Sequence, residues 1–194
     1  MVGMTTTHEP KVTLHAAPVT TVCPLTQRRK EVAQAVAIYL VSGDVPVHPT
    51  NRWITAELNH LAAAVRTHGQ RPDTPLAPAD AARCLVALMR SEISDPVCDW
   101  LADGLLDPTV LVRALAELAP DNLVFEPLFL LMWCELRDGN SAAADEALAR
   151  LRAVDSSYLR TRGERNSRWI AGLPADARGR TQRLGCAGIG RSRP

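Results

Sequence analysis

The sequence predicts an all-α protein, an irregular bundle of about seven helices that ends in a repeat-like helical hairpin. Apolar residues recur at the 3.6-residue spacing of amphipathic helices, and short stretches rich in glycine and proline separate these segments. No alternating apolar and polar run is long enough for a convincing strand. The 194 residues are 46% hydrophobic and 22% charged, the composition of an ordinary globular domain. This composition excludes collagen-like, disulfide-scaffold and membrane-spanning classes.

The first two helices are predicted over residues 26–41 and 51–67. Thr26 is expected to cap the first helix, and Gly43 to provide its left-handed exit. The residues expected to face inward are Val32, Ala35, Val36, Tyr39 and Leu40 in the first helix, and Ile54, Leu58, Leu61 and Val65 in the second. Gly69 is expected to end the second helix.

Three shorter helices are predicted over residues 78–91, 96–103 and 108–119. In the first of them the residues expected to face inward are Ala81, Cys84, Leu85, Leu88 and Met89. The other two begin at Asp95-Pro96 and Asp107-Pro108. In each pair the aspartate offers a cap acceptor, and the proline occupies the first helical position, where no N–H is needed. Gly104 and Pro120 are expected to end these two helices.

The last two helices, 125–138 and 142–154, are expected to form a tight antiparallel hairpin in the core. The first is apolar nearly all round, which is typical of a helix buried on several sides. Gly139 is expected to end it and Ser141 to cap its successor. The residues expected to be buried are Leu128, Leu131, Trp133 and Cys134 in the first helix, and Ala144, Ala147, Leu148 and Leu151 in the second.

Three stretches between Pro78 and Tyr158 carry a resemblance to a known family: PADAARCLVAL, EPLFLLMWCELRDGN and AAADEALARL. Here the chain resembles the C-terminal part of an actinobacterial family of unknown function. The last two stretches are similar to one helix pair of a tetratricopeptide-type repeat, with a long apolar helix, a glycine turn and alanines at helical spacing. The resemblance implies a helical fold and brings no catalytic residue with it.

The chain divides into three parts. Residues 1–24 are expected to be disordered or loosely packed, residues 25–158 to form the helical domain, and residues 159–194 to form a basic tail rich in arginine and glycine. The tail holds nine arginines against Glu164 and Asp176, a net charge of +7. Because the whole chain has a net charge of +1, the first 158 residues carry −6. An acidic body with a basic tail is the clearest charge asymmetry.

The sequence favours a cytoplasmic protein without a membrane segment. The N-terminus lacks the basic start and apolar run of a signal peptide, and no segment approaches 18 consecutive apolar residues. The number of cysteines, five, is odd, and no CxxC spacing occurs. These thiols are therefore expected to be reduced, and Cys84, Cys98 and Cys134 to be buried.

No catalytic motif is found among GxxxxGK[ST], GxGxxG, GxSxG and HExxH. We therefore predict no catalytic residue, no cofactor and no metal. His60 and His68 lack zinc-ligand spacing. The stripe Asp95, Asp99 and Asp103 is interpreted as a helix cap followed by two solvated residues. An enzyme site assembled between helices stays an open alternative, recognisable by a pocket with convergent titratable groups.

Two functions from different classes are compatible with the sequence. The first is a non-catalytic protein that acts through contacts with an unidentified protein partner, with Trp53 and Trp100 as interface candidates. The alternative is an accessory, sequence-nonspecific binder of nucleic acid. The candidate residues for the alternative are the tail arginines Arg160, Arg162, Arg165 and Arg168. The sequence leaves the oligomeric state open.

Overall fold

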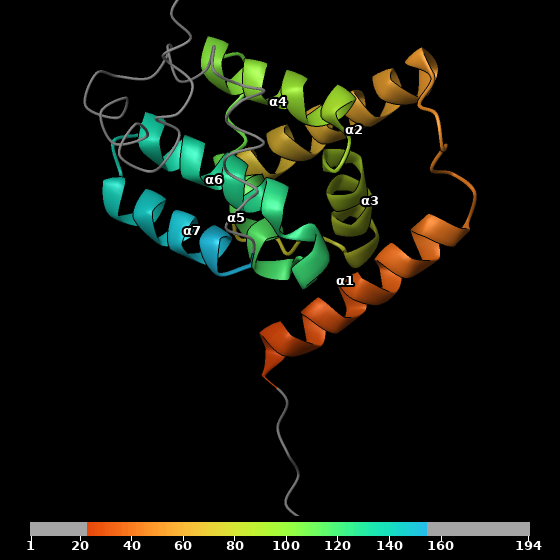
Figure 1. Ribbon diagram of the computed structural model, residues 1–194, viewed down its shortest axis with the longest axis horizontal. Coiled ribbons are helices and arrows are strands. Elements are labelled where there is room, and N and C mark those ends of the chain that lie inside the picture. The colour runs from red at the N-terminus through yellow and green to blue at the C-terminus, as the bar shows by residue number, and fades with distance from the viewer. Residues whose placement is uncertain (1–22, 155–194) are drawn as a thin grey trace, which may run out of the picture.

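A computed structural model of the protein describes residues 23–154. Within this range seven α-helices and one short 3-10 helix follow one another without a strand, which confirms the all-α prediction (Figure 1). The α-helices are α1 (Pro24–Val41), α2 (Asn51–Gln70), α3 (Pro78–Leu88), α4 (Ser91–Asp103), α5 (Thr109–Leu118), α6 (Phe125–Arg137) and α7 (Ser141–Val154). The basic tail lies outside the described residues, as does the predicted N-terminal segment except for its last two residues.

Helices α3 and α6 form the centre of the core. Eleven consecutive residues of α6, from Glu126 to Leu136, are buried, so the nearly all-apolar sequence marks a helix enclosed on several sides. Leu128, Leu131, Trp133 and Cys134 are buried as predicted. Three residues, Asp138–Asn140, connect α6 to α7, and the two helices lie side by side (Figure 1). A connection this short requires the antiparallel hairpin that the sequence predicts.

Helix α1 is the outermost element of this arrangement and packs mainly along α3 (Figure 1). Its buried residues, Val32 and Val36, are four apart and therefore on one face. Ala35 and Tyr39 are half-buried against the same core. The opposite face of α1 thus has no helix of the described range packed over it.

Glycines end several helices as predicted. Gly43, Gly104 and Gly139 have φ of 83°, 66° and 75°, the left-handed region that glycine enters at no steric cost. Asp107 Oδ1 accepts a hydrogen bond from the Thr109 N–H at 3.0 Å, as expected. Pro108, however, is the N-cap of α5 rather than its first helical residue.

Several predicted ends are wrong. Helix α3 ends at Leu88, three residues before the predicted end at residue 91. Helix α1 starts at Pro24 and has no side-chain cap, so Thr26 does not cap it. Helix α2 continues through Gly69 to Gln70. Helix α4 starts at Ser91, because the N–H groups of Ile93 and Ser94 both donate to the Arg90 carbonyl. These bonds start the helix before Asp95, so Pro96 lies inside the helix rather than at its first position.

The N-terminal end of α7 also differs from the prediction, because its side-chain acceptor lies one residue earlier than expected. Asn140 Oδ1, rather than Ser141, accepts a hydrogen bond from the Ala143 N–H, at 3.5 Å.

Two residues that were predicted to face inward are exposed instead. Leu40 and Met89 are 52% and 49% exposed, because each lies at the end of its helix, where no neighbouring helix covers it.

Candidate protein-binding surface

The two tryptophans proposed as interface residues are half-buried and pack against the core. Trp53 lies in the first turn of α2, where its N–H donates to Thr50 Oγ1 at 3.2 Å. Its indole Nε1 donates to the Asp44 carbonyl at 3.1 Å. Trp53 therefore anchors the loop between α1 and α2 to the domain.

The same loop is fastened at a second point. Arg90 Nη2 donates to the Pro46 carbonyl at 3.1 Å, and Ser42 Oγ donates to Asp44 Oδ2 at 2.7 Å. Val47 follows directly and is 79% exposed. The loop thus presents a large apolar side chain from a backbone that hydrogen bonds hold in place.

Helix α1 presents a broader apolar surface on the side away from α3. Its last turns expose Ile38 by 67% and Val41 by 84%. We call this surface the α1 outward face. It consists of Ala33, Gln34, Ala37, Ile38, Leu40 and Val41, all of which are exposed. Gln34, Ala37 and Val41 follow the three-and-four spacing that lines up side chains along a helix.

Charged groups flank the α1 outward face. Lys30, one turn before Gln34, is exposed, and Asp44 is exposed just past the C-terminal end of α1. The face therefore carries a positive charge at one end and a negative charge at the other.

A partly buried ion pair holds α2 to α3 beneath α1. Arg83 Nε and Nη2 each lie 2.9 Å from a different carboxylate oxygen of Glu57, a two-bond geometry that is among the strongest available to these groups. The Glu57 side chain is 3% exposed. Its hydrogen bonds raise the pKa of Arg83 above the ordinary value. Burial, followed by the charge of Glu57, raises the pKa of Tyr39 on α1.

This pair was not predicted from the sequence. Glu57 lies between Ile54 and Leu61 on the inward face of α2, so a carboxylate at that position signals a buried partner. Nothing in the sequence assigns that partner to Arg83, which is 26 residues away.

Within the described residues, His60 and His68 belong to no group of potential metal ligands. His60 Nε2 lies 4.0 Å from Asp80 Oδ1 but has no hydrogen-bond partner among the described residues. No group of three potential metal ligands occurs in residues 23–154. Asp95, Asp99 and Asp103 all lie within α4, so the predicted cap role of Asp95 is not realised.

The arginines proposed for nucleic-acid binding, Arg160, Arg162, Arg165 and Arg168, lie outside the described residues. In the described part of the chain, no helix has both the length and the apolar character needed to cross a bilayer.

Comparison of the chain with protein-family models, with curated protein sequences and with solved structures found no match.

Proposed function

We propose that this protein acts through protein–protein contacts and that the α1 outward face makes them. The observation that carries the proposal is the exposure of Ile38 and Val41, at 67% and 84%, on a regular helix at the edge of the domain. Leaving such side chains in water forgoes the free energy that burial would provide, about 1.5–3 kcal/mol for a large aliphatic side chain. A partner surface recovers that free energy.

A second copy of the chain is the partner that this face fits best. A twofold interface requires a surface that is complementary to itself. Antiparallel pairing of two α1 helices about Ala37 places the apolar turns of each against those of the other. It also places Lys30 of each copy near Asp44 of the other, so opposite charges meet at both ends. The small side chains of Ala33 and Ala37 allow the two helix axes to approach closely.

The expected dimer is weak. Stable interfaces bury about 800 Å² per partner, and the end of one helix with Val47 provides less than that. We therefore expect a dissociation constant in the micromolar range. Sedimentation equilibrium of the full chain, measured from low micromolar to millimolar concentration, should show a monomer–dimer equilibrium.

The Ala37→Arg variant is the sharpest test. It places two arginines at the twofold axis, where their repulsion and their size should abolish the dimer. Ala37 is exposed on the helix, so folding should be unaffected. Leu105→Arg is the matched control, because Leu105 is also exposed, at 68%, and lies beyond α4. A wild-type chain that stays monomeric throughout, or an Ala37→Arg variant that dimerises like wild type, would overturn the proposal.

A further inference from the structure

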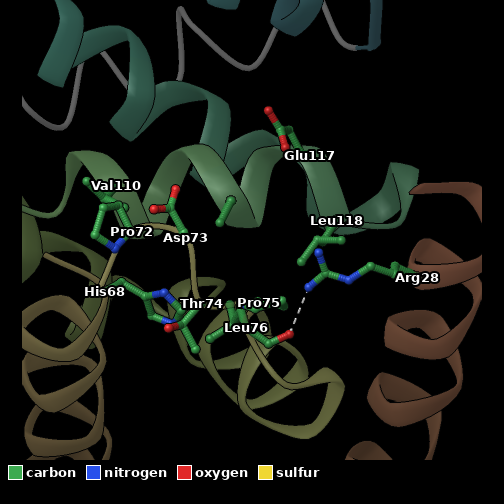
Figure 2. Close-up of a pocket in the computed structure, with 11 residues that line it drawn as sticks. Arg28, His68, Pro72, Asp73, Thr74, Pro75, Leu76, Val110, Glu117 and Leu118 are labelled. Carbon is green, nitrogen blue, oxygen red and sulfur yellow. Dashed lines mark hydrogen bonds between the residues drawn. The ribbon is translucent and has the colours of Figure 1, made fainter. Parts of the chain in front are cut away.

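A small cavity lies between the end of α2, the loop that follows it, α5 and the start of α1 (Figure 2). Its volume of about 200 Å³ is below the range of about 300–1,000 Å³ that is typical of pockets for drug-sized ligands. The buried residues His68, Leu76 and Leu118 contribute to its lining, and the exposed residues Asp73 and Thr74 stand on the solvent side. The cavity therefore suits a molecule of few heavy atoms that enters past the loop.

His68 is a buried residue in the wall of this cavity. It is only 6% exposed, yet its imidazole makes no hydrogen bond or ion pair with any residue in the range 23–154. A neutral imidazole carries one N–H donor and one nitrogen acceptor. Neither ring nitrogen of His68 is among the fully enclosed side-chain atoms without a partner, so both are open to the solvent of the cavity. A polar molecule inside the cavity would supply the partner that this ring lacks.

Opposite charges stand on the two sides of the cavity. Arg28 reaches in from α1, and its Nη2 donates to the Leu76 carbonyl at 3.0 Å (Figure 2). A guanidinium has five N–H donors, so others remain for a ligand. Asp73 lies on the same side as His68 (Figure 2), and its carboxylate forms no hydrogen bond or ion pair with the described residues. Helix α5 adds an apolar wall with Val110, Ala114 and Leu118.

We propose that this cavity binds a small zwitterion of the size of a free α-amino acid. Arg28 binds its carboxylate, Asp73 binds its ammonium group, and Val110 and Ala114 contact its short apolar side chain. His68 completes its own hydrogen bonding on the bound molecule. Glu117 on α5 is a third charged residue of the lining, so a molecule that carries both a carboxylate and an ammonium group matches these charges better than a simple anion does. This site is separate from the α1 outward face, and neither proposal depends on the other.

The test is an NMR titration of the full chain with L-alanine. The ring signal of His68, assigned by its absence in the His68→Gln variant, should shift and saturate. Asp73→Asn should weaken this binding by about tenfold or more, the loss expected for a hydrogen bond between charged groups. Asp145→Asn, which changes an exposed aspartate on α7, should bind L-alanine as wild type does. Asp73 is exposed in a loop, so its variant should melt at the wild-type temperature.

Two further probes separate the charges. Propionate lacks the ammonium group and ethylamine lacks the carboxylate, so each should produce a much smaller shift than L-alanine at equal concentration. Three outcomes would overturn the assignment: no shift of the His68 signal at millimolar L-alanine, a shift as large with either single-charge probe, or equal affinities of Asp73→Asn and wild type.

Discussion

Arg83 and Glu57 form a two-bond ion pair in which the two side chains are buried to very different degrees. The Glu57 side chain is 3% exposed and the Arg83 side chain 36%. The carboxylate therefore depends on the guanidinium far more than the reverse, since Arg83 reaches water without its partner.

This asymmetry predicts unequal effects of the two single substitutions. Arg83→Met keeps an apolar side chain of similar length and leaves a buried, unpaired carboxylate, so it should lower the free energy of unfolding by about 3–5 kcal/mol. Glu57→Gln leaves a neutral amide that still accepts from Arg83, so its cost should be clearly smaller. Urea unfolding of both variants measures the difference, and a larger loss in Glu57→Gln would show the interpretation to be wrong.

The positions of the helices were predictable because each depends on a local pattern. The 3.6-residue spacing of apolar residues and the glycines at 43, 104 and 139 act within a few residues of the backbone they shape. The start of α4 was missed because the Asp95-Pro96 pair is a strong local start signal. Bonding of two N–H groups to the Arg90 carbonyl places the start one turn earlier.

The candidate surfaces were less predictable because they depend on which helices meet. Leu40 follows the apolar period of its helix and was placed inside, but no neighbour covers the end of α1. Arg28 and His68 line one cavity although they are 40 residues apart in the sequence. Trp53 was predicted as an interface residue, and its anchoring of the loop became clear only from its hydrogen bond to the Asp44 carbonyl.

The core position of α6 predicts a large effect of Leu131→Ala. Leu131 is buried, so the substitution removes apolar contacts and leaves a cavity, at a cost of about 2–5 kcal/mol. Leu105→Ala makes the same change at an exposed site and should alter stability by no more than about 0.5 kcal/mol. Thermal melts of the two variants compare these losses directly, and equal melting temperatures would contradict the assignment of Leu131 to the core. Removal of residues 180–194 should also change stability little, since that sequence has few apolar residues to bury.

We predict that the environment of His60 makes the folded protein less stable in mild acid. Burial, followed by the nearby charge of Arg83, lowers the pKa of His60 below its ordinary value, although Asp80 lies 4.0 Å away. Asp80 is more than half exposed, so solvent weakens its attraction. The unfolded chain then binds a proton at His60 more readily than the native protein, and stability falls as the pH drops through the unfolded pKa of about 6.5. Urea midpoints between pH 7.5 and pH 5.5 should fall less in His60→Gln than in wild type, and identical slopes would refute the prediction.

The cysteines are expected to differ strongly in reactivity. Cys23 is exposed, and hydrogen bonds from the backbone of Leu25 and Thr26 lower its pKa, which favours the reactive thiolate. Burial raises the pKa of Cys84 and of Cys134 to about 12. Iodoacetamide should therefore alkylate Cys23 first in the native protein, and Cys84 and Cys134 only after unfolding. The experiment uses the Cys186→Ser variant, so that only cysteines of the described residues can be alkylated. Peptide mass spectrometry then identifies which cysteine has reacted. Rapid alkylation of Cys84 in the native state would contradict its burial.

The last prediction concerns the basic tail and tests the alternative function, sequence-nonspecific binding of nucleic acid. Its nine arginines and two acids should attract any nucleic acid without regard to sequence, because the attraction is to phosphates. Affinity for a duplex and for an unrelated duplex of equal length should agree, and the logarithm of the binding constant should fall linearly with the logarithm of salt concentration. Deletion of residues 159–194 should abolish this binding, because the remaining chain has a net charge of −6 and repels phosphate.

Fluorescence anisotropy of labelled duplexes at several salt concentrations measures both the salt dependence of binding and the effect of the deletion. Substitution of Arg160, Arg162, Arg165 and Arg168 by glutamine should lower the slope if these residues contact phosphates. Equal binding by the truncated and full-length chains would eliminate the tail as a nucleic-acid site.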